Sequence, residues 1–110
     1  MIITTDHGMI RVQNPIKIVG DRNTNTNLRY KQGKNLNWDN NNKMMVSRKP
    51  EQLFLPKPNV STSYVFAKED YMFAYPNNYN NFVNHYKNTF QHGGISLEEC
   101  IIPVVYLTGK

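Results

Sequence analysis

The N-terminus combines an apolar run with a polar turn. Residues 1–5, "MIITT", are apolar or β-branched, and Asp6, His7 and Gly8 follow directly. β-Branched residues favour strands and glycine favours turns, so the pattern predicts a strand that ends in a turn carrying Asp6 and His7. Ligand sites in open α/β sheets lie beyond the carboxyl ends of strands, which makes this turn a candidate functional site.

The central part of the chain is mainly polar. From residue 13 to about residue 49 the sequence is rich in asparagine and has few apolar residues apart from "IKIV" at 16–19. This composition predicts a long loop at about 13–49 that contains one short strand. Within it, the asparagine-rich "NWDNNNK" at 37–43 predicts an exposed loop tip.

Apolar periodicity returns in the second half of the chain. The segments "STSYVFA" at 61–67 and "YMFAY" at 71–75 are rich in aromatic and β-branched residues, and a polar turn separates them, which predicts a hairpin. In residues 77–90 the apolar positions recur at helical spacing, which predicts an amphipathic helix. These positions are Tyr79, Phe82, Val83, Tyr86 and Phe90.

The C-terminal stretch predicts two further elements. We expect the amphipathic helix to end at Gly93 and Gly94, and Ser96 with Glu99 three residues later predicts a capping box that opens a second, short helix. The apolar run "IIPVVYL" at 101–107 predicts a buried strand, placed at an edge or a bulge by its proline.

Composition limits the chain to one domain, and the predicted strands and helices place it in the mixed α/β class. The sequence has 110 residues, of which 39% are hydrophobic and 19% charged. No apolar run approaches the roughly 20 residues of a membrane span, and no signal-peptide pattern is present, so we expect no membrane partner and a cytoplasmic location. The single cysteine, Cys100, has apolar neighbours and is expected to be buried rather than nucleophilic.

The net charge of +5 favours an anionic partner. Arginine can bind two phosphate oxygens and tyrosine can stack on a base, so the basic segment around Tyr30 is a candidate for binding a phosphate or an oligonucleotide. A solvated basic loop is the alternative. The basic residues concerned are Arg22, Arg29, Lys31 and Lys34.

Two histidine-glycine motifs carry the candidate chemistry. Asp6 and His7 can give a carboxylate oxygen and an imidazole nitrogen to one divalent cation. His92 stands in a second such motif, "QHGG". Taken singly, the first motif also fits a surface turn and the second a helix C-cap. Taken together, they predict that Asp6, His7 and His92 converge on one site.

Longer segments resemble a known family. "TTDHGMIRV", "GDRNTNTNLRYKQGKNL", "LPKPNVSTSYVFAKEDY" and "YPNNYNNFVNHYKNTFQHGGISLEECIIPVV" closely resemble the C-terminal part of the PglZ domain of the alkaline phosphatase superfamily. Specifically, they resemble the version attached to PorX-type response regulators of Bacteroidetes. It implies that residues 1–110 are a C-terminal fragment of an alkaline-phosphatase-like fold, with short strands, one amphipathic helix and a long basic loop.

The resemblance also implies a metal site and a reaction. In that superfamily two zinc ions catalyse phosphoester hydrolysis, and by position Asp6 and His7 match the ligands of one zinc and His92 a ligand of the other. The family's nucleophile and remaining ligands precede the Asp-His-Gly strand, so none is expected in this chain and we expect it to be inactive alone.

The wider context implied by the resemblance is specific. It comprises phosphodiesterase action on oligonucleotides, an upstream receiver domain and control of type IX secretion. The alternative is a non-catalytic basic module that binds nucleic acid or a protein partner. Exposed sheet edges would favour a homodimer in either case.

Overall fold

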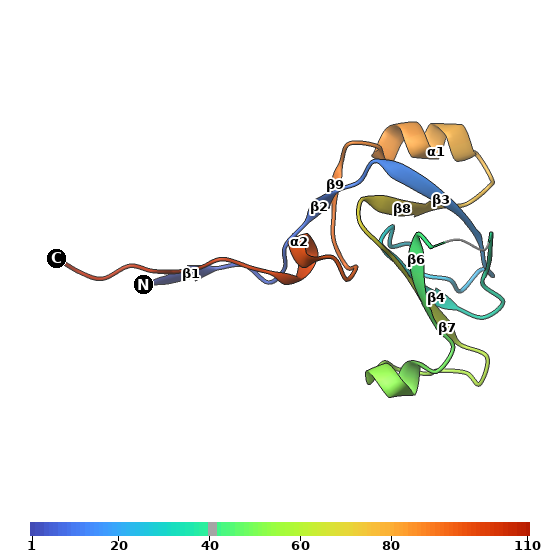
Figure 1. Ribbon diagram of the computed structural model, residues 1–110, viewed down its shortest axis with the longest axis horizontal. Helices are drawn as coiled ribbons and strands as arrows, with labels where there is room; N and C mark the ends of the chain where they lie inside the picture. Colours follow the sequence, from blue (N-terminus) through green and yellow to red (C-terminus); the bar gives the residue numbers. More distant parts are fainter. Residues whose placement is uncertain (40–41) are drawn as a thin grey trace.

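The computed structural model describes residues 1–39 and 42–110, which form a β-rich body and a projecting two-stranded ribbon (Figure 1). In the ribbon, β1 (Ile2–Thr4) pairs antiparallel with β10 (Val104–Tyr106). The molecule measures 58 × 34 × 24 Å, and its radius of gyration of 16.2 Å exceeds the roughly 13 Å of a compact chain of this size. The ribbon accounts for this elongation, because both termini lie on it, far from the body.

The body contains one mixed and one antiparallel sheet. In the mixed sheet, β3 (Asn14–Val19) pairs parallel with β8 (Tyr71–Ala74) and antiparallel with β5 (Asn37–Trp38). Ile16 and Ile18 of β3 are buried, whereas Lys17 between them is exposed, as the two-residue period of a strand requires.

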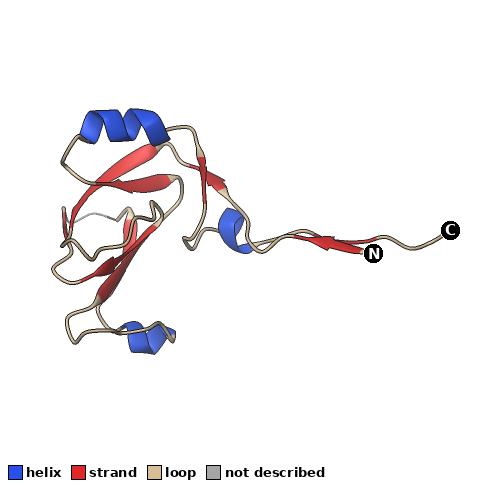
Figure 2. Cartoon of the chain, turned by 180° about the vertical axis from the view of Figure 1, so that it is seen from behind, coloured by secondary structure: helices blue, strands red, loops and turns tan. Residues whose placement is uncertain are grey.

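In the antiparallel sheet, β7 (Ser63–Ala67) lies between β4 (Tyr30–Gly33) and β6 (Met44–Ser47). The short 3-10 helix η1 (Pro50–Leu53) follows β6 and lies at one end of the body (Figure 2).

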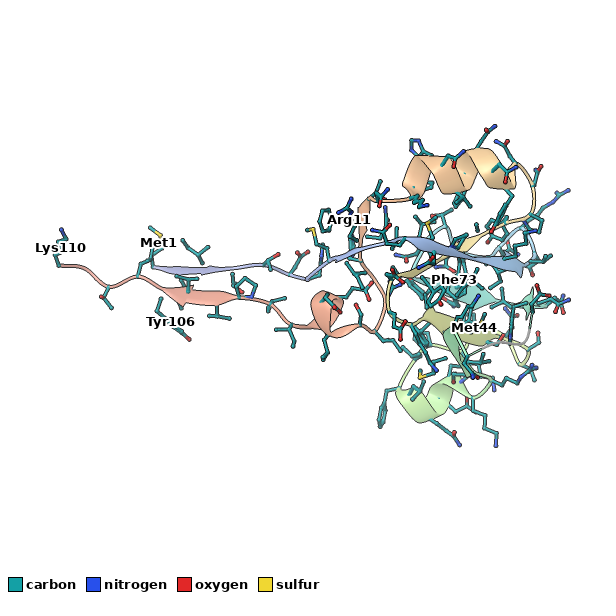
Figure 3. All side chains as sticks on the ribbon, turned by 45° about the horizontal axis from the view of Figure 1, so that its top comes forward. Met1, Arg11, Met44, Phe73, Tyr106 and Lys110 are labelled. Atoms are coloured by element: carbon teal, nitrogen blue, oxygen red, sulfur yellow. The ribbon has the colours of Figure 1, made fainter. Side chains whose placement is uncertain are left out.

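Two groups of apolar side chains form the core. The first includes residues of both sheets, among them Met44 and Phe73 (Figure 3), and its buried members are Ile16, Ile18, Met44, Val65, Ala67 and Phe73. The second lies under helix α1 (Tyr79–Tyr86), whose partly buried apolar residues pack against Ile10, Val12, Leu28 and Met72.

The ribbon joins the body through a short strand pair and a short helix. Strand β2 (Ile10–Arg11) pairs antiparallel with β9 (Phe90–Gln91), and α2 (Leu97–Cys100) lies at the junction (Figure 1). As predicted, Ser96 and Glu99 form a capping box at the start of α2. The predicted N-terminal strand and the α/β class are also confirmed.

The prediction of a long loop at about 13–49 is wrong in part: its one short strand, at 16–19, is confirmed within β3, but further strands occupy the segment. Strands β3 to β6 occupy much of this segment, and Leu28, Arg29 and Lys31 within it are buried. The asparagines there make backbone contacts; Asn25 Oδ1, for example, accepts the Gln32 amide at 2.7 Å. Polar side chains in this segment hydrogen-bond to the backbone of neighbouring strands, so the polar composition does not indicate an open loop. The predicted loop tip at 37–43 includes residues 40 and 41, which lie outside the described residues.

The predicted hairpin of 61–67 and 71–75 is also wrong. Both segments contain strands, but β7 and β8 belong to different sheets. The backbone at 28–29 bonds to both: Leu28 O accepts the Phe73 amide at 2.8 Å and Arg29 O accepts the Ala67 amide at 2.9 Å. These bonds replace the pairing that a hairpin would need.

The amphipathic helix is confirmed over 79–86 but ends earlier than predicted. Asn88 has a φ of 66°, a left-handed conformation that stops a helix, and Phe90 is exposed in β9. The C-terminal strand is β10, which is exposed and not buried. Cys100 is exposed as well, contrary to expectation.

Candidate metal centre

The two histidine motifs lie at the junction of ribbon and body. Residues 6–8 connect β1 to β2, and residues 92–94 connect β9 to α2. Because β1 pairs with β10 and β2 pairs with β9, the two connections run side by side between the same strand pairs. The topology therefore brings segments 85 positions apart into contact.

The two predicted histidine ligands meet at this junction, and Asp6 lies beside His7. The imidazole rings of His7 and His92 are stacked, with centroids 3.7 Å apart and planes 13° from parallel. Asp6 Oδ1 lies 3.6 Å from His7 Nε2. The contact between His7 and His92 agrees with the predicted meeting of the two motifs, whereas a shared site with Asp6 and the role of all three as metal ligands stay predictions.

The orientation of His7 leaves one ring nitrogen available. Its Nδ1 lies 2.7 Å from Gly8 O, so a hydrogen on Nδ1 is donated to that carbonyl and the lone pair resides on Nε2. Nε2 is also the ring nitrogen that lies 3.6 Å from Asp6 Oδ1. The side chain of Asp6 is 88% exposed and that of His7 35%, so both donors are accessible.

The donor set fits zinc chemically, because carboxylate oxygen and imidazole nitrogen are both common zinc ligands. Within residues 1–39 and 42–110, however, no three His, Cys, Asp or Glu side chains are arranged to hold one ion. The ring nitrogens of two parallel, stacked imidazoles point along separate planes and do not converge. The stacked rings therefore offer no common point for one ion, and the assignment of Asp6 and His7 to one ion and His92 to another stays a prediction.

A glycine is required after each histidine. A Cβ on Gly8 would lie 2.0 Å from the backbone oxygen of Glu98 in α2, closer than any real contact allows. Gly93 has a φ of 102°, and its Cβ would lie 2.6 Å from Asn27 Nδ2. Both loops are thus packed against neighbours that only glycine can approach.

Sequence reasoning missed the contacts that Asn27 and Glu99 make to these loops and the pairing of Arg29 with Glu99. Asn27 Nδ2 donates to His92 O at 3.1 Å. Glu99 O accepts the Gly8 amide at 2.9 Å, and the carboxylate of Glu99 is paired with Arg29. The capping-box pattern identified Glu99 as a helix residue, but nothing in the sequence pairs it with an arginine 70 positions away.

Two of the four predicted phosphate-binding residues are not available. Arg29 is 0% exposed and its guanidinium is occupied by Glu99 and by backbone carbonyls. Lys31 is 1% exposed, and its Nζ donates to Asn25 O at 3.0 Å and lies 4.8 Å from the centre of the Tyr75 ring. Burial lowers the pKa of Lys31 to about 8. The prediction that these two side chains bind a phosphate is therefore wrong for this structure.

The other two basic residues remain on the surface. Arg22 is exposed, and Lys34 is half-buried beside a pocket of about 200 Å³ that Asp21 also lines. Their predicted contact with a phosphate stays a prediction.

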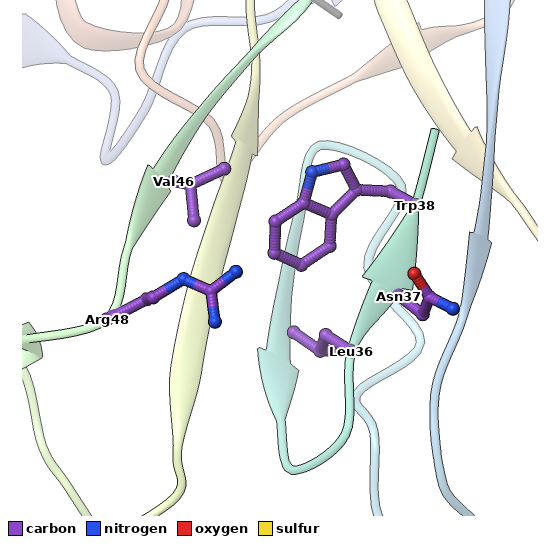
Figure 4. A pocket seen from close by; sticks show the side chains of 5 residues that line it. All are labelled: Leu36, Asn37, Trp38, Val46 and Arg48. Carbon is purple, nitrogen blue, oxygen red and sulfur yellow. The ribbon is translucent and has the colours of Figure 1, made fainter. Parts of the chain in front are cut away.

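A larger pocket, of about 450 Å³, lies between β5 and β6 (Figure 4). The guanidinium carbon of Arg48 is 5.7 Å from the centre of the Trp38 ring there. The pocket is lined by Leu36, Asn37, Trp38, Val46 and Arg48, so none of the three predicted ligands contributes to it. It is therefore not part of the candidate metal centre.

Comparison with known proteins gave one family. The model of the BREX system PglZ alkaline phosphatase-like domain matches residues 1–107. No curated protein matches the chain. In the part of the chain that the structure describes, no helix combines the length and the apolar character needed to cross a membrane.

Proposed function

Because this chain belongs to the PglZ alkaline phosphatase-like family, we propose that it is part of a phosphoesterase-type domain whose metal centre includes Asp6, His7 and His92. The observation that carries the proposal is the meeting of the two histidine motifs, with the imidazole centroids 3.7 Å apart and Asp6 beside His7. The α/β architecture agrees with a portion of an alkaline-phosphatase-like fold.

Each of the three side chains has a distinct role in this proposal. Asp6 and His7 would hold one zinc ion, and His92 would hold a second. Bound zinc would supply a Lewis acid that stabilises negative charge on phosphoryl oxygens. The backbone of Gly8 fixes the ring of His7 by accepting the Nδ1 hydrogen, which keeps Nε2 free as a donor.

The nucleophile and the other metal ligands are proposed to come from outside these residues. Structural zinc normally takes four ligands and catalytic zinc three protein ligands, so a pair and a single histidine make weak sites. We therefore expect this chain alone to bind zinc weakly and to hydrolyse no phosphodiester above the metal-ion background.

The finer context rests on the sequence resemblance alone. We propose a PorX-type response regulator with an upstream receiver domain, a cytoplasmic location, an oligonucleotide substrate and a role in type IX secretion. Arg22 and Lys34 are the remaining candidates for contacting the substrate's phosphates.

Zinc titration of the 110-residue chain tests the metal centre. His7→Gln and His92→Gln should each weaken zinc binding measured by isothermal titration calorimetry, because each removes a nitrogen donor. His85→Gln is the matched control, since His85 is exposed on α1 and lies outside the junction. Equal zinc affinity in all three variants and the wild type would contradict the proposal, as would hydrolysis of bis-p-nitrophenyl phosphate that depends on His7 in this chain alone.

One observation favours the alternative, an interaction module without catalysis. The ribbon exposes apolar side chains on both strands, including Ile2, Ile3, Val104 and Val105. Exposed apolar surface of this kind is typical of a docking element. Retained partner binding together with no zinc binding would favour this module over the phosphoesterase.

A further inference from the structure

A buried ion pair lies between the two histidine loops and the body. Arg29 Nε donates to Glu99 Oε1 at 2.9 Å, and Arg29 Nη2 donates to Glu99 Oε2 at 3.1 Å. The two side chains are 0% and 2% exposed. Such a bidentate pair has a fixed geometry, and removing one partner leaves the other charge buried without compensation.

On one side, Glu99 contacts both loops. Its Oε1 accepts the Gly94 amide at 3.0 Å, and its Oε2 accepts the amide and the hydroxyl of Ser96 at 3.0 and 2.7 Å. Its backbone carbonyl accepts the Gly8 amide at 2.9 Å. The loop after His7 and the loop after His92 are therefore both hydrogen-bonded to Glu99.

On the other side, Arg29 contacts the two sheets. Its Nη2 donates to Ala67 O at 3.2 Å, at the end of β7, and its Nη1 donates to Tyr71 O, at the start of β8. The arginine thus connects the carboxylate that holds the loops to the backbone of β7 and β8. These contacts occupy the guanidinium, which explains why Arg29 does not serve a substrate.

We propose that Arg29 and Glu99 are positioning residues for the metal centre, which hold His7 and His92 in register without touching a metal or substrate. The expected effect on metal affinity rests on the proposed function, whereas the hydrogen-bond geometry does not. The hydrogen bonds also keep Glu99 ionised. Burial raises the pKa of Glu99, but hydrogen bonds from Arg29 and Ser96 and the arginine charge lower it more, so the net pKa lies below the ordinary value.

The test compares Glu99→Gln with Glu98→Gln. The two changes remove the same charge from adjacent residues of α2, but Glu98 is exposed. Glu99→Gln should speed hydrogen exchange of the Gly94 amide, weaken the nuclear Overhauser contact between the His7 and His92 rings, and lower zinc affinity about 10- to 100-fold. Glu98→Gln should change none of these.

If Glu99→Gln unfolds the chain, the Ser96→Ala variant still tests the inference. It removes the hydroxyl bond to Oε2 and the hydroxyl's part in the capping box of α2, but leaves the bonds from Arg29 and from the Gly94 and Ser96 amides to the Glu99 carboxylate, so smaller shifts in the same direction are expected, with a nearly unchanged circular dichroism spectrum. A folded Glu99→Gln variant with the ring contact and zinc affinity of Glu98→Gln would overturn the inference. A wild-type chain that binds no zinc, but whose ring contact is lost in Glu99→Gln, would contradict the proposed function and support the positioning role.

Discussion

Gly8 and Glu99 determine the site geometry as much as the predicted ligands do. Gly8 donates its amide to Glu99 O, and the space where a side chain would begin is filled by the backbone of α2. The position of Asp6 and His7 therefore depends on the close packing of Gly8 against the backbone of α2.

Replacing Gly8 by alanine should displace α2 from the Asp-His turn. The added Cβ would lie 2.0 Å from the Glu98 carbonyl oxygen, and backbone cannot yield as a flexible side chain can. We expect a loss of about 1–3 kcal/mol in the free energy of unfolding, measured by urea denaturation, together with weaker zinc binding. Gly109→Ala is the control, because its Cβ meets nothing within 4 Å. Equal stability of the two variants would show that the turn is not packed as described.

Lys31 should make stability depend on pH. Burial lowers its pKa from 10.5 to about 8 in the folded chain, so between these values the unfolded chain binds more protons. The free energy of unfolding should therefore rise from pH 8 toward pH 10, by at most about 1.4 kcal/mol per pH unit, and this contribution should be flat below pH 8. Urea denaturation at several pH values measures it. Lys31→Met should lack this rise, and an identical slope in both proteins would contradict the assignment.

At this scale the sequence predicted the meeting of the two histidine motifs but not the residues that support them. The Asp-His-Gly and His-Gly-Gly motifs are local, and each points to chemistry through residue type alone. The burial of Arg29 depends on Glu99, 70 positions away, and on two carbonyls that become neighbours only in the folded chain. A basic residue in a polar segment is therefore predicted to be exposed, because the sequence does not reveal its buried partner.

At the scale of elements, local pattern predicted the strands better than their pairing. Segments 63–67 and 71–74 are strands, as their aromatic and β-branched residues indicate. Their separation into two sheets follows from the bonds that Leu28 and Arg29 make to both, which no periodicity encodes. The helix α1 was predicted from its apolar spacing, but its end depends on a single left-handed residue.

Asn88 should be the residue that ends α1. It lies two residues beyond the helix with a φ of 66°, where asparagine and glycine are tolerated and a β-branched residue is not. Asn88→Val should lower the free energy of unfolding by about 1–2 kcal/mol, whereas Asn88→Gly should leave it nearly unchanged. Thermal unfolding followed by circular dichroism compares them. An equal loss in both variants would assign the effect to the asparagine side chain instead of the backbone.

At the scale of the whole molecule, the ribbon differs from the body. Side chains of β1 and β10 are exposed along both strands, whereas β7 and β8 are largely buried. Strands with apolar residues on both faces are typical of the interior of a sheet covered by helices on either side. The ribbon therefore has the composition of a core element without a covering layer.

Such a ribbon should make the isolated chain self-associate. Ile3 and Val105 are cross-strand neighbours, 51% and 44% exposed, and the outer edges of β1 and β10 have open hydrogen-bonding groups within the described residues. Sedimentation velocity should show concentration-dependent dimers or larger species in the wild type, and Ile3→Lys with Val105→Lys should shift the chain toward monomer. Val19→Lys is the control, since Val19 is 50% exposed on the body and the change adds the same kind of charge. A wild type that stays monomeric at high concentration, or a control that dissociates equally, would contradict the ribbon as the contact surface. Because the substituted positions lie on the ribbon and not in the histidine loops, zinc affinity should be retained in the monomeric variant, which separates self-association from the metal centre.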